Sequence, residues 1–360
     1  MPVSLSYSLS DQSFERTKSL GILGLSIRLA EALSQTNAIG SLTVFSNSSL
    51  SSQLKLGPNT KTRDHNHAAS NALGRAAWDQ IGCYAAARRS GEEWLFLPKG
   101  FASFLRRPPR KLAAYVHDVM HDHYRRNVPG GFSKFESWYF KQALAATLRQ
   151  ANVIFTNTEF TRSEVLRVAG EQAITPPPVV VAGIGFAENT TAAAKLDRIV
   201  VLAGRWPHKR SDLAVDWVER WRHQVDYRGE IHLVGGLPEK LQAPPGWREH
   251  PRLPDGEFAA VLASARALVY FSDYEGFGMP PVEALVAGAC PVFSDVPATR
   301  EVMGGRGCPF QNSDFDSFAK AMSSALEADR ATLERWSTEL RARHNWASVT
   351  SRVVQALQEN

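Results

Sequence analysis

Cysteine is scarce in this sequence, and its three occurrences, Cys83, Cys290 and Cys308, form no motif. Their spacings match neither a zinc site nor a disulfide framework, so we expect thiols that pack in a reducing cytoplasm. Long apolar runs are missing as well. Because no window of about eighteen apolar residues occurs, we expect no membrane span. The first residues lack a basic segment followed by an apolar core, so we also expect no secretory signal.

The sequence also lacks the G-x-G-x-x-G fingerprint that dinucleotide-binding folds place after their first strand. We expect the first strand at residues 3–9 and a helix at residues 26–33, with Gly21 and Gly24 just before that helix. Two glycines at such a place are often a tight turn. The missing fingerprint argues against a nicotinamide enzyme.

Positive charge is in small excess, and it is unevenly distributed along the chain. The net charge of +5 divides into +8 for residues 1–182 and −3 for residues 183–360. A basic first half indicates an anionic partner such as nucleic acid, a phospholipid surface or a lipid diphosphate, and surface charge that serves solubility is the alternative. No nucleic-acid motif accompanies the charge, so we expect no nucleic-acid partner. A chain of 360 residues with 44% hydrophobic and 21% charged residues suits two globular domains.

The most informative stretch is residues 267–294, ALVYFSDYEGFGMPPVEALVAGACPVFS. Residues 267–271 are apolar and rich in β-forming side chains, which predicts a short buried strand. A glycine loop follows, and Pro280 and Pro281 suit the first turn of a helix, where a missing N–H costs nothing. In a parallel α/β sheet such a loop lies at the carboxyl edge of the strands, where ligands bind.

Two carboxylates frame this loop. Glu275 lies before the glycines and Glu283 lies in the first helical turn, and both can accept hydrogen bonds from vicinal hydroxyls. Gly276 and Gly278 let the backbone approach a ligand closely, and the N–H groups at a helix start favour phosphate or sugar oxygens. A helix-start charge and a solvated acid are the alternative explanation of the two carboxylates.

A second loop with the same context lies upstream. Residues 199–203 predict a strand, and the segment GRWPHKR at residues 204–210 leads into a further helix. Arg205 can bond two phosphate oxygens at once, and Lys209 supplies a point charge. The strand-loop-helix context argues against plain surface cations, so the pair predicts a diphosphate site.

Both loops resemble motifs of one family. Residues 275–283, EGFGMPPVE, resemble the E-x7-E signature of the retaining glycosyltransferases of family 4, which have the GT-B fold. Residues 204–209 are similar to that family's diphosphate-binding loop, and the order and spacing of the two loops fit the family as well. The resemblance extends over most of the chain and is strongest in its second half.

The resemblance implies an α/β fold of the GT-B type, in which two Rossmann-like domains with parallel sheets face each other across a cleft. A C-terminal helix is expected to cross back to the N-terminal domain. The acceptor domain is expected at residues 1–184 with the return of residues 344–360, the linker at 185–197, and the nucleotide-sugar donor domain at 198–343.

The resemblance also implies roles for the donor-side residues. Glu275 is expected to bind sugar hydroxyls and Glu283 the ribose diol. Arg205 and Lys209 are expected to stabilise the charge on a departing nucleoside diphosphate. The remaining donor-binding residues are expected to be Gly204, Gly235, Leu253, Gly276, Phe277 and Gly278.

Three histidines and two aspartates crowd residues 117–123, a composition typical of metal ligands. The resemblance instead assigns His117 to the sugar site as a catalytic residue, with Asp118 as its orienting neighbour. We therefore expect no metal and no cofactor besides the nucleotide-sugar co-substrate. The acceptor-side candidates are Gly21, Gly24, Asp118, His121 and Tyr124.

Residues 101–111, FASFLRRPPRK, interleave aromatic and aliphatic side chains with cations. That composition is typical of an anchor in the headgroup region of an anionic membrane, and a packing turn followed by solvated charges is the alternative. In a helix expected at residues 132–150, Phe135 and Trp138 lie on a broad apolar face that we expect to pack in the core. Residues 47–67 are expected to be a mobile surface loop.

The sequence therefore predicts a retaining, metal-independent hexosyltransferase. Its expected donor is a nucleoside-diphosphate sugar, with GDP-mannose favoured over a UDP-sugar. Its expected acceptor is a saccharide or lipid-linked saccharide of bacterial polysaccharide or lipopolysaccharide synthesis. We expect a cytoplasmic location, with the inner face of the cytoplasmic membrane as a peripheral site. A sugar-nucleotide epimerase or hydrolase of the same fold, and an inactive nucleotide-sugar-binding scaffold, are the alternatives.

Overall fold

The computed structural model describes residues 2–15, 20–128, 130–186, 193–251, 253 and 255–360. These residues form two compact units. Unit 1 consists of Met1–Gly185 and Asn345–Asn360, and unit 2 consists of Phe186–His344. Within the predicted linker at residues 185–197, residues 187–192 lie outside the described part of the chain.

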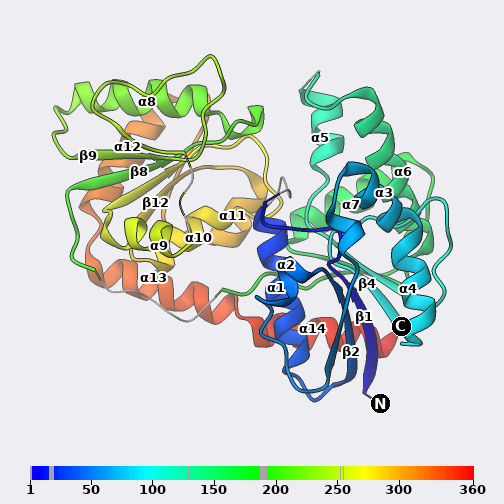
Figure 1. The fold of residues 1–360 in the computed structure, drawn as a ribbon. Coiled ribbons are helices and arrows are strands. Elements are labelled where there is room, and N and C mark those ends of the chain that lie inside the picture. Colours follow the sequence, from blue (N-terminus) through cyan, green and yellow to red (C-terminus); the bar gives the residue numbers. More distant parts are fainter. Residues whose placement is uncertain (1, 16–19, 129, 187–192, 252, 254) are drawn as a thin grey trace. The chain divides into compact units, whose positions relative to one another are not determined.

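Unit 1 is built on a seven-stranded sheet with the order β3-β2-β1-β4-β5-β6-β7, and all its strand pairs are parallel. Parallel strands need long crossovers, and the helices of this unit supply them. The strands are β1 (Val3–Ser8), β2 (Ile39–Ser46), β3 (Thr60–Asp64), β4 (Trp94–Leu97), β5 (Lys111–Val116), β6 (Val153–Thr156) and β7 (Val179–Val181). The helical segments are α1 (Leu20–Ser34), α2 (Ser48–Ser51), η1 (Asn66–Ala69), α3 (Ala72–Ala77), η2 (Trp78–Gly82), α4 (Cys83–Ser90), α5 (Met120–Asn127), α6 (Lys134–Gln150), α7 (Glu159–Glu171) and α14 (Trp346–Glu359) (Figure 1).

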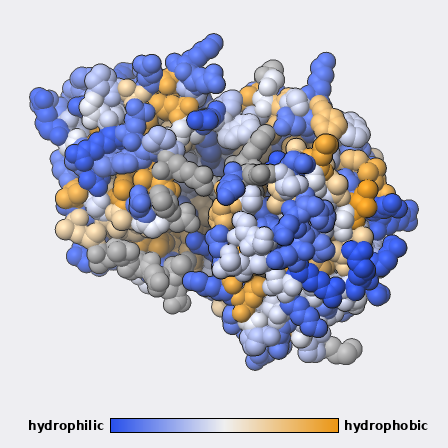
Figure 2. Space-filling model, in the orientation of Figure 1, coloured by the Kyte–Doolittle hydropathy of each residue, from blue (hydrophilic) through white to orange (hydrophobic). Residues whose placement is uncertain are grey.

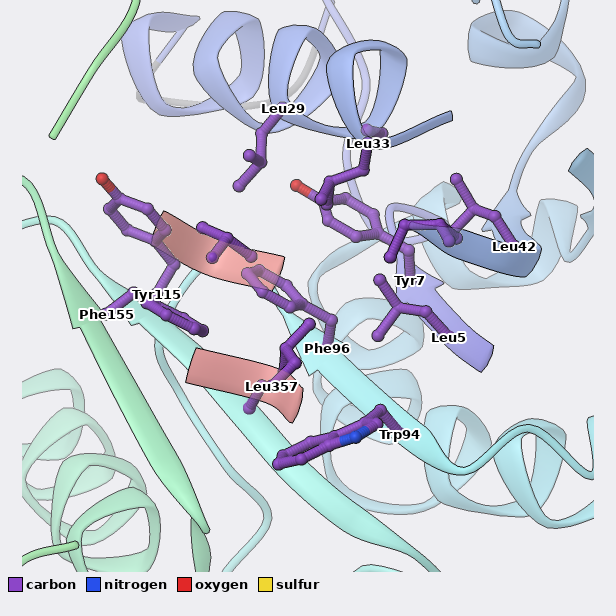
Figure 3. Packing of buried hydrophobic residues seen from close by; sticks show 14 of the residues in the cluster. Leu5, Tyr7, Leu29, Leu33, Leu42, Trp94, Phe96, Tyr115, Phe155 and Leu357 are labelled. Atoms are coloured by element: carbon purple, nitrogen blue, oxygen red, sulfur yellow. The ribbon is translucent and has the colours of Figure 1, made fainter. Parts of the chain in front are cut away.

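Two hydrophobic clusters lie on opposite faces of this sheet. Along β4, Trp94 and Phe96 belong to one cluster, while Leu95 and Leu97 belong to the other, because successive side chains of a strand point to opposite faces. The first cluster is the larger. It contains Tyr7, Phe96 and Phe155, whose rings stack in a row, and Leu357 of α14 packs against them (Figure 3). The C-terminal helix is thus part of the core of unit 1, as predicted.

Unit 2 is built on a six-stranded sheet with the order β10-β9-β8-β11-β12-β13, again with parallel pairing throughout. Phe271, Phe310 and Phe318 pack on one another and on Trp217 to form the centre of one face. The strands are β8 (Arg198–Leu202), β9 (Glu230–Val234), β10 (Arg248–His250), β11 (Ala267–Tyr270), β12 (Cys290–Ser294) and β13 (Cys308–Phe310). The helical segments are η3 (Pro207–Lys209), α8 (Ser211–Gln224), α9 (Asp255–Ser264), α10 (Met279–Val286), α11 (Pro297–Met303), α12 (Phe315–Glu327) and α13 (Arg330–Arg343). The expected α/β class with two parallel sheets is therefore confirmed.

Two elements of unit 1 differ from the sequence prediction. Helix α1 begins at Leu20, so Gly21 and Gly24 lie inside a helix and not in a loop before it. Burial of Leu23 and Ile27 against the sheet outweighs the weak helix propensity of the glycines. The segment 47–67, expected as a loop, contains β3. This strand lies at the edge of the sheet and its side chains are mostly exposed, so it carries no apolar alternation that a sequence pattern could detect.

The first turns of α6 were also predicted wrongly. Phe135 and Trp138 are 69% and 49% exposed, although the apolar stripe of this helix predicted that both lie in the core. The stripe continues into Leu144 and Leu148, which are buried as expected. The helix thus buries its C-terminal half and leaves the aromatic residues of its first turns at the surface.

The position of Leu357 makes the return helix testable. Because this side chain is buried against the sheet of unit 1, Leu357→Ala leaves a cavity and should lower the free energy of unfolding by about 2–5 kcal/mol. Denaturant unfolding measures the change, with the half-exposed Leu166→Ala in α7 as the matched control. Equal unfolding midpoints for the two variants would contradict the assignment of α14 to this core.

Candidate functional site

Two loops leave the sheet of unit 2 side by side. Strands β8 and β11 pair in parallel, with Leu202 opposite Tyr270. The loop at residues 203–210 follows β8 and the loop at residues 271–278 follows β11. Because carboxyl ends of neighbouring parallel strands meet at one edge, the two motif loops lie next to each other, although 66 positions separate Lys209 from Glu275.

Three donors converge on a single oxygen of Glu275. The ammonium Nζ of Lys209 lies 2.7 Å from Oε1 of Glu275. The hydroxyl of Tyr270 donates to the same Oε1 at 2.5 Å, and Oγ of Ser272 donates to it at 2.7 Å. The Lys209 ammonium also donates to the Tyr270 hydroxyl at 2.5 Å. The structure thus brings together the predicted Lys209 and Glu275, and it adds two residues that the sequence reasoning missed.

This cluster fixes the ionisation of its members. Burial opposes the charge on Glu275, but the charge of Lys209 and the hydrogen bonds from Lys209, Tyr270 and Ser272 outweigh it and hold the pKa of the Glu275 carboxyl below its usual value. Burial, followed by the charge of Glu275, raises the pKa of Tyr270 well above its usual value. At neutral pH the site therefore holds an ionised carboxylate and a neutral phenol that donates to it.

A hydrogen-bonded chain fixes the loop that carries Ser272. The backbone N–H of Ser272 donates to Oγ of Ser294 at 2.9 Å, and that hydroxyl donates to Oδ1 of Asn312 at 2.6 Å. The amide of Asn312 then donates to the carbonyl of Ser272 at 3.1 Å and to Oδ1 of Asp273 at 2.7 Å. Sequence reasoning missed Ser294 and Asn312 because a single polar residue at or just after the end of a strand forms no motif of its own.

Glycines at this edge leave room that no other residue would. A Cβ on Gly235, which has a φ of +102°, would lie 2.2 Å from the Ala203 carbonyl. A Cβ on Gly204 would lie 2.8 Å from Cγ of Lys209, and one on Gly236 would lie 2.9 Å from Nε of Arg205. The exposed Arg205 thus lies beside the turn after β9. The predicted Gly204 thus lets Lys209 lie close to the sheet edge, Gly236 does the same for Arg205, and the predicted Gly235 lets the turn after β9 lie against Ala203.

The glycine loop before α10 presents backbone rather than side chain. Gly278 has a φ of +84° and precedes the first turn of α10; a Cβ there would lie 2.4 Å from Oγ1 of Thr299. The ring of Phe277 is buried against Phe186 and His344 of the same unit. A side chain so buried does not reach a ligand, so any contribution of Phe277 comes from its backbone N–H.

Three further residues were predicted to bind the donor, namely Glu283, Gly276 and Leu253. Glu283 is a half-buried residue of α10, and its charge adds to the elevation of the pKa of Tyr270. Gly276 is buried in the loop, and Leu253 is half-buried between two residues outside the described part of the chain.

In unit 1, His117 directly follows β5 and is buried. Its Nε2 lies 2.8 Å from the carbonyl of Pro98, so Nε2 carries the proton and donates to it. The ring stacks on Tyr115 with centroids 4.7 Å apart. Burial lowers the pKa of His117 to about 4 against the opposing effect of the Pro98 hydrogen bond. The imidazole is therefore neutral at neutral pH, and its buried Nδ1 has no partner among the described residues.

The acceptor-side candidates serve local structure. Oδ1 of Asp118 accepts the N–H of Met120 at the start of α5, and His121 is buried between Phe101 and Phe140. Tyr124 is 1% exposed and packs on Phe132. With Gly21 and Gly24 inside α1, their predicted role in acceptor binding stays a prediction without support from these contacts.

The histidines of residues 117–123 do not gather around a common point. His123 bonds with Asn127 in the next turn of α5, whereas His117 and His121 have the separate partners given above. Among the residues that the structure describes, no three His, Cys, Asp or Glu side chains form a group that could hold a metal ion. The expectation that no metal takes part stays a prediction.

Residues 197–328, in unit 2, match the family model described as glycosyl transferases group 1. The chain is 26% identical over 216 residues to the O-antigen chain mannosyltransferase B of Escherichia coli, covering 53% of this chain and 56% of that protein. It is 29% identical over 238 residues to the MMP alpha-(1->4)-mannosyltransferase of Mycolicibacterium hassiacum, covering 60% of this chain and 56% of that protein. The chain thus spans about half the length of these curated relatives.

One solved structure shows that the fold extends over the whole chain. HepE of Anabaena, solved in complex with UDP and glucose, superposes with a TM-score of 0.70 at 14% identity, covering 99% of this chain and 100% of that one. An identity this low shows the fold alone, and that fold is GT-B. The fold thus extends over the whole chain, whereas the similarity to the group 1 glycosyltransferases is carried by residues 197–328 of unit 2.

Proposed function

We propose that this protein is a retaining hexosyltransferase that transfers a hexose from a nucleoside-diphosphate sugar to a saccharide or lipid-linked saccharide. GDP-mannose is the donor that we favour, because both curated relatives named above are mannosyltransferases. The observation that carries the proposal is the convergence of Lys209 and Tyr270 on Glu275 at the edge of the sheet. A bacterial polysaccharide or lipopolysaccharide is the proposed product, made at the inner face of the cytoplasmic membrane.

Lys209 and Arg205 are the proposed diphosphate ligands. The Lys209 ammonium has three N–H donors, of which Glu275 and Tyr270 take two, so one donor is left for a phosphate oxygen. The exposed Arg205 guanidinium adds a two-pronged donor from the same loop. Together they would neutralise the charge that grows on the departing nucleoside diphosphate.

Glu275 and the glycine loop are the proposed sugar ligands. The three hydrogen bonds described above all reach Oε1 of Glu275, which leaves Oε2 as the acceptor for a sugar hydroxyl. Backbone N–H groups of residues 276–278 supply the donors, and Glu283 on α10 accepts from the ribose diol. In unit 1, the unprotonated Nδ1 of His117 is a separate hydrogen-bond acceptor for a substrate hydroxyl.

The proposed chemistry is a same-face displacement without a metal. The bond between the anomeric carbon and the phosphate oxygen breaks, and the acceptor oxygen bonds to that carbon from the same side. The acceptor's proton passes to the departing phosphate oxygen, so the diphosphate acts as the base. The contribution of the protein is the orientation of the sugar and the stabilisation of the leaving group, which need no protein nucleophile.

Substitution of the two central charges tests the site. Lys209→Ala and Glu275→Gln should each lower kcat/KM by about a hundredfold or more, because each removes a preorganised electrostatic contact. Release of nucleoside diphosphate in the presence and absence of acceptor measures the effect. Arg228→Ala, which changes an exposed arginine paired with Asp226, is the control. Rates within threefold of wild type for both site variants would refute the assignment.

Tyr270 gives a prediction for the pH dependence. Tyr270→Phe removes a hydrogen bond that favours the ionised form of Glu275, so the pKa of this carboxyl should rise towards its usual value. The acid limb of kcat/KM should therefore move to higher pH, and kcat should fall about tenfold or more. Tyr227→Phe, which removes a hydroxyl bonded to Asp197, should leave the profile unchanged. An unmoved acid limb in the Tyr270 variant would show that Glu275 does not depend on this hydroxyl.

A thermal-shift screen tests the donor. A nucleotide sugar present at about 100 times its Kd stabilises the folded protein by about 2.7 kcal/mol. We expect the largest increase in Tm with GDP-mannose and its loss in Lys209→Ala. A larger shift with a UDP-sugar would replace the proposed donor. Consumption of donor that is independent of acceptor would indicate an epimerase or hydrolase, and stabilisation without turnover would indicate a binding scaffold.

A further inference from the structure

One region of the surface of unit 1 combines exposed aromatic and aliphatic side chains with cations. Leu105, Phe135 and Trp138 are 61%, 69% and 49% exposed. They come from the loop after β4 and from the first turns of α6, and the ring of Phe104 links them, since it lies 5.5 Å from that of Trp138. Phe135 lies 5.9 Å from Trp138 in turn. In Figure 2, orange residues gather at the right, over the region where Figure 1 draws α3 and α6.

The cations of this surface are not used within the protein. Arg106, Arg107 and Lys134 are exposed, and none of them forms an ion pair with any residue that the structure describes. The neighbouring Lys111, by contrast, pairs with Glu93 at 3.1 Å. We call this set the docking patch; it comprises Phe104, Leu105, Arg106, Arg107, Lys134, Phe135 and Trp138.

Hydrogen bonds to the buried Ser103 fix the loop half of the docking patch. Ser103 is fully buried, and its N–H donates to the Tyr84 hydroxyl at 2.8 Å while its Oγ donates to the carbonyl of Gln80. The same Oγ accepts the N–H groups of Leu105 and Arg106 at 3.1 and 2.9 Å. This turn holds Leu105 and Arg106 at the surface, so the patch loses little conformational entropy on binding.

The helix half is held by its cap. Oγ of Ser133 accepts the N–H of Glu136, and the carboxylate of Glu136 accepts the N–H of Ser133. This capping box fixes the first turn of α6, and residues three apart on a helix lie on one face. Phe135 and Trp138 therefore stand together at the surface. Glu136 is the one acid within this turn, and its carboxylate is engaged in the cap.

We propose that the docking patch binds the surface of an anionic phospholipid bilayer. Exposed Trp, Phe and Leu favour the headgroup region, where an apolar body meets a polar environment, and unpaired cations beside them are attracted to anionic lipid. The three cations Arg106, Arg107 and Lys134, against the one engaged acid Glu136, give the charge complementarity. Among the described residues no helix is long and apolar enough to span a bilayer. This inference rests on the membrane location given in the proposed function and assigns residues to it. Its test does not depend on the proposed chemistry.

Vesicle cosedimentation of the full-length protein tests the docking patch, in the absence of donor and acceptor. The protein should bind vesicles of phosphatidylcholine with phosphatidylglycerol, should bind phosphatidylcholine alone much more weakly, and should dissociate as salt rises. Arg106→Gln combined with Arg107→Gln should reduce binding about twenty-five-fold, at about fivefold for each cation near an anionic surface. Phe135→Ser combined with Trp138→Ser should reduce binding more at high salt than at low salt. High salt screens the charges, so the apolar contribution that this variant removes then carries most of the binding.

Matched controls separate the patch from general charge. Arg88 and Arg89 form an exposed arginine pair on α4 of the same unit, and Arg88→Gln with Arg89→Gln should leave vesicle binding within twofold. Leu166→Ser, at a residue that is 40% exposed on α7, is the control for the apolar pair. Unchanged Tm for each variant shows that the fold is intact, and the charge pair and the apolar pair test the patch independently.

Four results would overturn the proposal. They are equal binding to neutral and anionic vesicles, equal losses in the Arg88/Arg89 control and in the Arg106/Arg107 variant, full binding by both patch variants, and stronger binding to DNA than to anionic vesicles at the same salt. Transfer to a soluble acceptor should persist in the patch variants, since none of their substitutions touches the site in unit 2. A loss of vesicle binding with intact transfer supports the patch, whereas a loss of transfer in the Lys209 or Glu275 variants concerns the proposed function alone.

Discussion

The ion pair between Lys209 and Glu275 is the interaction on which the candidate site depends. Its partners are 26% and 12% exposed, so each charge would be costly without the other. Glu275 gains two further donors, and Lys209 gains the phenol of Tyr270 and the face of its ring. The pair thus keeps a carboxylate and an ammonium ionised side by side at a sheet edge, where one can accept from hydroxyls while the other attracts phosphate.

Several features of unit 2 hold Lys209 next to Glu275. Parallel pairing of β8 with β11 places the two loops at one edge. The chain from Ser272 through Ser294 to Asn312 ties the second loop to β12 and to the segment after β13. Gly204 lets the Lys209 side chain lie against the backbone. A site held by neighbouring strands moves less than one held by a free loop, and electrostatic stabilisation depends on such preorganisation.

Much of the fold and of the candidate site was predictable from the sequence. The buried strands and both motif loops follow from local pattern, as at residues 267–271 and 204–210. The part of Tyr270, whose hydroxyl bonds to both Lys209 and Glu275, was not predictable, because an aromatic residue in a buried strand has the pattern of a core residue whether or not its hydroxyl serves a site. The exposure of Phe135 and Trp138 was missed for the reverse reason. An apolar stripe along a helix does not show which of its turns packs against the core, because burial depends on elements that are distant in sequence.

A crystal structure of the protein with an intact nucleoside-diphosphate sugar tests the central claim most directly. The account predicts the diphosphate within about 3 Å of the Lys209 ammonium and the Arg205 guanidinium, with a sugar hydroxyl on the second oxygen of Glu275 and the bonds to its first oxygen retained. A diphosphate bound away from these two cations, or a sugar with no contact to Glu275, would contradict it.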